Sequence, residues 1–384
     1  MTKKPSYRFV GYTEPWERRK LGEISSRVKG NDGRMDLPTL TISAGQGWLD
    51  QRERFSGNIA GKEQKNYTLL RKGELSYNHG NSKLAKYGVV FQLNNYTEAL
   101  VPKVYHSFKM IDGRSGTFFE YLFATKIPDR ELGKLVSSGA RMDGLLNITY
   151  DDFMSIKLTF PKNNEEQTAI GSFFQDIDQL ISLQQRKLEV LKEQKKTYLK
   201  LLFPAKGQTK PALRFAGFED EWKEVKLGEV CSIKGGNAWK SEHYSTDGKY
   251  LVVTISNVKG NEYIDDTYGN RIDTVESQFI LEQGDILISL TGNVGRVSKM
   301  TEVSAVLNQR VGKLATNQSN NFLFTLLSNR NFEKEMVLSS QGAAQANISN
   351  NDVLNYKTSF PSLPEQEVIG SFFQDLDKAI AKQE

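Results

Sequence analysis

The strongest constraint on this chain is an internal repeat, because self-similarity at a long period decides the architecture before any single motif does. Residues 8–26 and 214–232 are identical at nine of nineteen positions, including the run Lys-Leu-Gly-Glu. Residues 171–178 (GSFFQDID) recur as residues 370–377 (GSFFQDLD). Both later segments follow the same landmarks, Asn-Ile-Thr/Ser, then Phe-Pro, then Glu-Gln. We therefore predict two copies of one unit, each a mixed α/β segment followed by a helix.

The two copies diverge between their matched ends. Residues 27–140 and 233–340 share only an outline, in which a hydrophobic strand after a Gly-acid turn leads into a Gly-Asn loop. A duplicated frame that holds two different inserts indicates two modules that recognise different targets. The alternative is that two domains have only drifted apart, because a shared fold does not fix a function.

A long amphipathic helix is predicted over residues 165–202. Its apolar residues recur in alternating steps of four and three, which is the 3.5-residue period of a coiled coil. At 1.5 Å per residue the helix is roughly 57 Å long and needs a partner to cover its stripe. The second copy offers one. We call the expected contact line the helix seam, formed by Ile170, Phe174, Ile177, Ile181, Leu188, Leu191, Tyr198, Leu202, Ile369, Phe373, Leu376 and Ile380. The alternative is a helix lying on a globular core.

Composition describes a globular protein of 384 residues, with 38% hydrophobic and 25% charged residues and a formal net charge of +5. This length predicts two domains or slightly more. The positive charge is compatible with a polyanionic partner, but it is weak evidence alone. A single cysteine, Cys231, excludes an internal disulfide and suits a reducing compartment. With no apolar run that could cross a bilayer and no export signal, we expect a cytoplasmic protein without a membrane partner.

The common catalytic motifs are missing from the sequence. There is no Gly-x4-Gly-Lys-Ser/Thr loop for ATP and no Gly-x-Ser-x-Gly elbow. One cysteine and three histidines in unrelated contexts do not supply the spaced ligands of a zinc site. We expect no catalytic residue, metal site or cofactor in this chain. A nuclease built from dispersed carboxylates stays open as an alternative.

The repeated motifs resemble those of the specificity subunit of type I restriction–modification enzymes over nearly the full chain. The resemblance rests on the twice-used Phe-x-Gly-Phe/Tyr…Trp…Lys-Leu-Gly-Glu entry and on the Asn-Ile-Thr/Ser…Phe-Pro…Glu-Gln…Ile-Gly-Ser-Phe-Phe exit. Leu201-Leu-Phe-Pro204 and Leu307-Asn-Gln-Arg-Val-Gly312 add to it. No single one of these motifs is specific to that family, but their order and their duplication are.

The resemblance implies an α+β fold with an internal pseudo-two-fold repeat, in which two long antiparallel coiled-coil-like helices separate two target recognition domains. The expected domains are residues 1–160 (first recognition domain), 161–205 (central helix), 206–362 (second recognition domain) and 363–384 (a short distal helix). Each recognition domain would read one half of an asymmetric, bipartite site in double-stranded DNA. Two modification subunits, which methylate adenine with S-adenosylmethionine, and restriction subunits, which use ATP and Mg²⁺, would be the protein partners.

Base-reading side chains are expected on loops of the two inserts, because loops vary without disturbing the frame. Arginine suits guanine, Asn or Gln suits adenine, and Lys more often holds phosphates. For any one residue the alternative is an ordinary solvated side chain. In the first copy the candidates are Arg52, Arg54, Lys62, Lys65, Asn78, His79, Asn81, Lys83, Arg114 and Arg141. In the second copy they are Lys234, Asn237, Lys240, Asn257, Lys259, Arg271, Thr291, Asn293, Arg296, Gln309 and Arg310.

Two other functions compete with a non-catalytic DNA-reading subunit. The first is a self-sufficient nuclease or methyltransferase, although the chain lacks the Asn-Pro-Pro-Phe/Tyr motif expected of an adenine methyltransferase. The second is a free-standing DNA-binding regulator with no catalytic partner.

Overall fold

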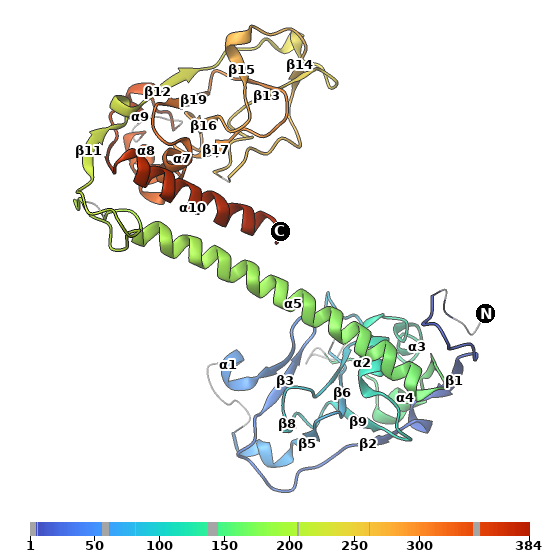
Figure 1. The fold of residues 1–384 in the computed structure, drawn as a ribbon. Helices are drawn as coiled ribbons and strands as arrows, with labels where there is room; N and C mark the ends of the chain where they lie inside the picture. Colours follow the sequence, from blue (N-terminus) through green and yellow to red (C-terminus); the bar gives the residue numbers. More distant parts are fainter. Residues whose placement is uncertain are drawn as a thin grey trace. The chain divides into compact units, whose positions relative to one another are not determined.

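A computed structural model describes residues 5, 7–55, 61–80, 82–136, 145–205, 207–260, 262–340 and 346–384, without the side chains of residues 54, 55 and 62. The chain divides into two compact units, Met1–Ser182 and Leu183–Glu384 (Figure 1). A continuous helix, α5 (Asn164–Leu201), ends the first unit and begins the second. Among the described residues, no helix is long and apolar enough to span a membrane.

The first unit places its strands between an opening strand and a closing strand. The strands are β1 (Glu17–Lys20), β2 (Ser25–Arg27), β3 (Leu40–Ser43), β4 (Gly47–Asp50), β5 (Thr68–Arg71), β6 (Leu75–Asn78), β7 (Val89–Gln92), β8 (Glu98–Val101), β9 (His106–Met110) and β10 (Lys157–Phe160). The helices besides α5 are α1 (Gln51–Phe55), α2 (Gly116–Ala124), α3 (Asp129–Leu132) and α4 (Tyr150–Ser155).

The second unit repeats this sequence of elements. Its strands are β11 (Lys223–Lys226), β12 (Cys231–Gly235), β13 (Tyr250–Val253), β14 (Arg271–Ile272), β15 (Ile280–Leu281), β16 (Ile286–Ser289), β17 (Val297–Lys299), β18 (Ala305–Leu307), β19 (Val311–Thr316) and β20 (Lys357–Phe360). Its helices besides α5 are α6 (Leu227–Val230), α7 (Asn320–Leu327), α8 (Arg330–Ser339), α9 (Asn350–Leu354) and α10 (Leu363–Ala381).

The divergent inserts have the same sheet topology. The main sheet runs β2-β9-β6-β7 in the first unit and β12-β19-β16-β17 in the second. Beside it, β8 pairs with β5 and β18 pairs with β15, in both cases antiparallel. A parallel contact, Thr39 with Leu100 in the first unit and β13 with β18 in the second, continues both smaller sheets. The two units are therefore one fold, although their inserts share little sequence.

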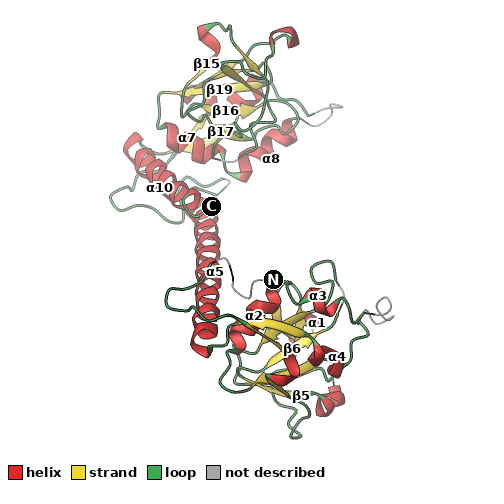
Figure 2. Ribbon diagram, turned by 90° about the vertical axis from the view of Figure 1, so that its right-hand side faces the viewer, coloured by secondary structure: helices red, strands yellow, loops and turns green. Residues whose placement is uncertain are grey.

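Each main sheet is covered on both faces. In the second unit Ile286 and Ile288 of β16 pack into the core formed with α7 and α8, whereas Leu287 between them packs into the core with β13 and β18. This alternation follows from the two-residue period of a strand. Figure 2 shows α7 and α8 on one side of β16 and β17 and the strand β15 on the other. A strand buried on both faces has a continuous apolar sequence, as Ile286-Leu-Ile288 has.

The repeated motifs are the parts that close each unit. Thr149 and Ser349, from the two Asn-Ile-Thr/Ser triplets, cap α4 and α9 in complete capping boxes with Asp152 and Asp352. The Phe-Pro segments end β10 and β20, which pair with β1 and β11. Conservation of these motifs between the copies therefore has a structural reason.

The Glu-Gln landmarks tie the start of each unit to its end. Glu166 is almost fully buried and accepts two hydrogen bonds of 2.6 Å from the guanidinium group of Arg8. Glu365 and Arg214 repeat this contact at 2.7 Å. Such paired contacts between a guanidinium and a carboxylate are strong and directional. We call the two pairs the Arg–Glu clamps.

A glycine shortly after each clamp glutamate, Gly171 in α5 and Gly370 in α10, lets the long helix pack closely against a shorter helix of its unit. A Cβ atom on Gly171 would lie 2.9 Å from the backbone nitrogen of Phe118 in α2. On Gly370 it would lie 2.7 Å from the backbone nitrogen of Phe322 in α7. Only glycine permits this distance between the two backbones.

The helix seam is divided between two environments. Ile369 and Phe373 of α10 are buried in the core of the second unit together with Leu202, so at these positions the two helices also pack on a globular core. Ile170 packs against the core of the first unit in the same way. The stripe is apolar here because it is part of a domain core.

Helix-to-helix contact is present further along, within the second unit. Lys195 of α5 forms an ion pair with Asp377 of α10, and the Tyr198 and Phe372 rings are 5.1 Å apart. Lys192 and Glu384 form another ion pair at 2.7 Å, so α10 runs antiparallel to this end of α5. Ile177, Leu188, Leu191, Leu376 and Ile380 are partly exposed, whereas Phe174 and Ile181 are about half exposed.

Candidate nucleic-acid interface

Three loops of the second unit meet at one end of its main sheet. The residues after β12 meet those between β18 and β19, through a parallel bridge between Asn237 and Asn308. The Gln309 N–H donates to the Asn237 carbonyl at 3.0 Å. The Leu290 N–H, just after β16, donates to the Arg310 carbonyl at 3.0 Å. The loop after β12 is thereby held beside two loops that lie more than fifty residues later in the chain.

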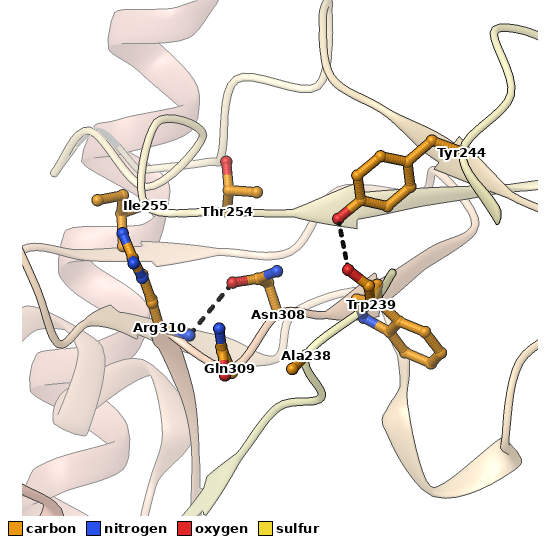
Figure 3. Close-up of a pocket in the computed structure, with 8 residues that line it drawn as sticks. All are labelled: Ala238, Trp239, Tyr244, Thr254, Ile255, Asn308, Gln309 and Arg310. Carbon is orange, nitrogen blue, oxygen red and sulfur yellow. Dashed lines mark hydrogen bonds between the residues drawn. The ribbon is translucent and has the colours of Figure 1, made fainter. Parts of the chain in front are cut away.

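A hollow of about 270 Å³ opens at this meeting point (Figure 3). One wall is aromatic, where the Tyr244 hydroxyl donates to the Trp239 carbonyl at 3.2 Å and the Trp239 indole N–H donates to the Leu307 carbonyl at 3.0 Å. Arg310 extends along the opposite wall beside Ile255. The residues that line the hollow are Ala238, Trp239, Tyr244, Thr254, Ile255, Asn308, Gln309 and Arg310. The hollow therefore combines an aromatic wall with amide and guanidinium groups.

Several polar side chains near the hollow are free to bind a ligand. Gln309, Arg310 and Asn293 are exposed, and none has a side-chain hydrogen bond or ion pair to another described residue. Thr291, on the loop with Asn293, has a buried hydroxyl without a partner among the described residues. Amide and guanidinium groups of this kind can form paired hydrogen bonds with base edges in the major groove.

Other candidates of the second unit already have partners in the fold. Asn257 is fully buried and donates to the Asp265 and Tyr268 carbonyls at 2.8 and 3.0 Å. Arg271 donates to the Gly248 carbonyl at 2.6 Å. These contacts indicate that both side chains hold loops in place.

The remaining candidates of the second unit are charged side chains. Arg296 pairs with Glu333 at 3.1 Å, Lys240 lies 3.6 Å from Glu242, and Lys259 pairs with Asp265. The pairing with Lys259 and Thr267 lowers the pKa of the Asp265 carboxyl to about 2. Lys234 is exposed on β12. Paired cations of this kind are less available to a phosphate than free ones.

In the first unit the corresponding end of the sheet carries Asn78 and His79. The Asn78 amide donates to the Ile42 carbonyl at 3.2 Å and accepts from the Gly80 N–H at 3.1 Å. His79 is buried, and its ring lies 4.7 Å from that of His106. Burial lowers the pKa of His106 below its usual value. Both histidine side chains are thus packed among aromatic rings.

The other candidates of the first unit are dispersed. Arg114 is nearly buried and pairs with Asp112 at 2.8 Å, so it supports the loop before α2. Arg52 is exposed but pairs with Asp50 at 2.9 Å, whereas Lys65 and Lys83 are exposed. Asn81, Arg141 and the side chains of Arg54 and Lys62 lie outside the described residues.

Sequence reasoning missed the hydrophobic and neutral residues of the hollow, above all Trp239, Tyr244, Thr254 and Asn308. A search for charged and amide groups on loops does not select them. The available signal was the connection between two buried strands, since Asn308-Gln-Arg310 is the short polar break between them. Among the described residues, no three His, Cys, Asp or Glu side chains are arranged to hold a metal ion.

Parts of the chain are similar to known DNA specificity subunits. Residues 219–384 match the family described as the type I restriction modification DNA specificity domain. The chain is 28% identical over 269 residues to the MjaVIII type I restriction enzyme specificity subunit of Methanocaldococcus jannaschii, covering 64% of this chain. It is 25% identical over 230 residues to the putative MjaX specificity subunit of the same organism, covering 56% of this chain. The chain is therefore similar to type I restriction enzyme specificity subunits, and its second half matches their DNA specificity domain.

The matches to these two specificity subunits span 61% and 51% of their lengths. A crystal structure of a type I restriction-modification system S subunit from M. genitalium has a similar fold. It superposes with a TM-score of 0.59 at 16% identity, covering all of this chain and 94% of that one. The α+β fold that the resemblance implies is thereby confirmed.

Proposed function

We propose that this chain reads a bipartite, asymmetric site in double-stranded DNA, each unit recognising one half, and that it has no catalytic activity of its own. The supporting observation is that two units with one sheet topology present different loops at the same end of the main sheet. A constant frame with variable loops is the arrangement that recognition proteins commonly use. The match of residues 219–384 to the type I restriction modification DNA specificity domain supports the assignment to DNA specificity.

The protein partners that we propose are those implied by the resemblance to type I specificity subunits. Two modification subunits would bind S-adenosylmethionine and methylate adenine, which must leave the base stack for this reaction. Restriction subunits would supply the ATP- and Mg²⁺-dependent steps. In this assembly the chain would hold the duplex on both sides of the reacting base.

A domain exchange tests the two-reader function. The chain is co-expressed with its modification subunits, and methylated adenines are mapped across the genome. Replacing residues 27–140 with the corresponding insert of a related specificity subunit should change one half of the recognised sequence and leave the other half unchanged. A change in both halves would contradict two independent readers.

A second experiment addresses the competing functions. Purified chain is incubated with DNA, Mg²⁺ and S-adenosylmethionine, with and without modification subunits. We expect no methyl transfer and no cleavage by the chain alone. Turnover without a partner would identify an autonomous enzyme. Binding to DNA with no methyl transfer, even when the modification subunits are present, would identify a free-standing regulator.

A further inference from the structure

One pair of positions corresponds between the two units although the sequences there have nothing in common. In the main sheets Phe108 of β9 lies opposite Leu75 of β6, and Leu314 of β19 lies opposite Ile286 of β16. Leu75 and Ile286 are the first residues of the corresponding strands β6 and β16, so Phe108 and Leu314 occupy equivalent positions. Val104 lies four residues before Phe108, and Arg310 lies four residues before Leu314, so Val104 and Arg310 are equivalent as well.

The backbone around these positions is built alike. Pro102–Tyr105 joins β8 to β9, and Asn308–Val311 connects β18 with the first residue of β19. Both four-residue stretches have the same exposure pattern, partly buried, exposed, exposed and buried. Val104 is 44% exposed, whereas Tyr105 and Val311 after the exposed pair are 8% and 0% exposed. The fold thus presents two adjacent side chains to solvent at the same place in each unit.

Arg310 has a fixed backbone and a free side chain. Its N–H donates to the Asn308 side chain at 3.3 Å, and its carbonyl accepts from Leu290 at 3.0 Å. By contrast, Arg214, Arg271 and Arg296 of the same unit are bound to partners within the fold. A guanidinium at the rim of the hollow in Figure 3, without a partner among the described residues, is available to a ligand.

We propose that this shared position reads a base in each half-site, Arg310 a guanine and Val104 the methyl group of a thymine. The inference rests on the proposed DNA-reading function and assigns two of its contacts. Arginine binds the O6 and N7 acceptors of guanine with two hydrogen bonds, and apolar side chains contact the thymine methyl.

The chemistry of Val104 argues against the simplest alternative, a grip on the phosphate backbone. A position that only holds phosphates needs a hydrogen-bond donor in both units. Valine has no donor on its side chain, so the first unit cannot hold a phosphate through the side chain at this position. A base-reading position, in contrast, is expected to differ between units that recognise different sequences.

Genome-wide methylation mapping tests the assignment in the assembled complex. Arg310→Val should abolish the requirement for guanine at one position of the second half-site while the first half-site stays the same. Val104→Arg should change one position of the first half-site only. Arg330→Ala, which removes an equal charge from an exposed residue at the start of α8, is the matched control and should leave the recognised sequence unchanged.

Binding measurements with modified bases identify the contacting atoms. Substituting 7-deazaguanine for the guanine that Arg310 reads should weaken binding of the unmodified complex roughly 5- to 150-fold, but should leave the Arg310→Val complex unaffected. Replacing the thymine that Val104 reads with deoxyuridine should weaken binding by the native chain, but not by the Val104→Ala variant.

The outcomes separate this inference from the proposed function. A native complex with no sequence preference would overturn both. A native complex that methylates a bipartite site, together with an Arg310→Val complex of unchanged preference, would overturn only the inference. Equal loss of affinity for all sequences in Arg310→Val and Arg330→Ala would show that Arg310 contributes charge alone, which also overturns it.

Discussion

The guanidinium group of Arg214 holds the carboxylate of Glu365 with two hydrogen bonds of 2.7 Å, and this carboxylate is 1% exposed. The contact joins the start of the second unit to its last helix, 151 residues later. Arg8 and Glu166 make the same contact in the first unit. Because the two clamps are equivalent, a substitution in the clamp of one unit can be compared with the same substitution in the other unit as its control.

Arg214→Ala should destabilise the second unit by about 1.5–3 kcal/mol, since it leaves a buried carboxylate without its charged partner. Thermal unfolding followed by calorimetry should show a lower transition temperature for one unit only. Arg8→Ala should lower the other transition instead. If both substitutions shift the same transition, the two units do not unfold independently.

Lys195 and Asp377 should be coupled energetically, because they join α5 and α10 within the second unit. Asp377 is 8% exposed and Lys195 is 27% exposed, so the pair is only partly screened by water. A double-mutant cycle with Lys195→Met and Asp377→Asn should give a coupling free energy of about 0.5–3 kcal/mol. The exposed pair Arg186 and Glu189 is the matched control and should give less than about 0.5 kcal/mol.

Glu120 should make the first unit less stable as the pH rises. Burial raises the pKa of its carboxyl from 4.5 to about 7, so the folded unit holds a proton that the unfolded chain releases above about pH 4.5. Its contribution to stability is present below pH 4.5 and is lost as the pH rises through about 7. Denaturant unfolding of Glu120→Gln at pH 5 and pH 8 should show a smaller loss of stability between the two values than unfolding of the native chain. An equal loss in both proteins would rule out Glu120 as the titrating group.

Cys231 should report unfolding of the second unit. Its thiol is buried at the start of β12, and burial raises its pKa to about 11, which suppresses the reactive thiolate. Since it is the single cysteine of the chain, alkylation needs no other substitution. We expect slow labelling of the native protein near pH 8 and fast labelling once denaturant unfolds the second unit. Fast labelling under native conditions would indicate that β12 opens locally.

The repeat predicted most of the frame from sequence alone. The landmarks that recur, such as Thr149 and Ser349 or Glu166 and Glu365, are caps and clamps whose geometry tolerates few other residues. The common sheet topology of the two inserts could not be predicted from the sequence. A strand that is buried on both faces accepts many different apolar sequences, so equivalent strands of the two units need not look alike. The 3.5-residue period was correct as a helix pattern, but it could not distinguish a domain core around Phe373 from a helix partner.

The candidate interface was predicted only in part. Loop position and side-chain chemistry selected Gln309 and Arg310, which the structure places together at the hollow. The same criteria selected Asn257 and Arg114, whose hydrogen bonds and ion pairs lie within the fold. Sequence shows that a polar group is present, whereas its availability depends on neighbours that are distant along the chain.

The pairing of β1 with β10 has a consequence for synthesis on the ribosome. Lys20 ends β1 and its partner Lys157 begins β10, so 137 residues separate them (157 − 20). At roughly 5–20 residues per second, β1 waits about 7–27 seconds for its partner strand to be made. Until then β1 has no partner on either edge among the described strands, and an unpaired edge is a template for association with other nascent chains. The charged sequence Glu-Arg-Arg-Lys of β1 opposes such association during this interval.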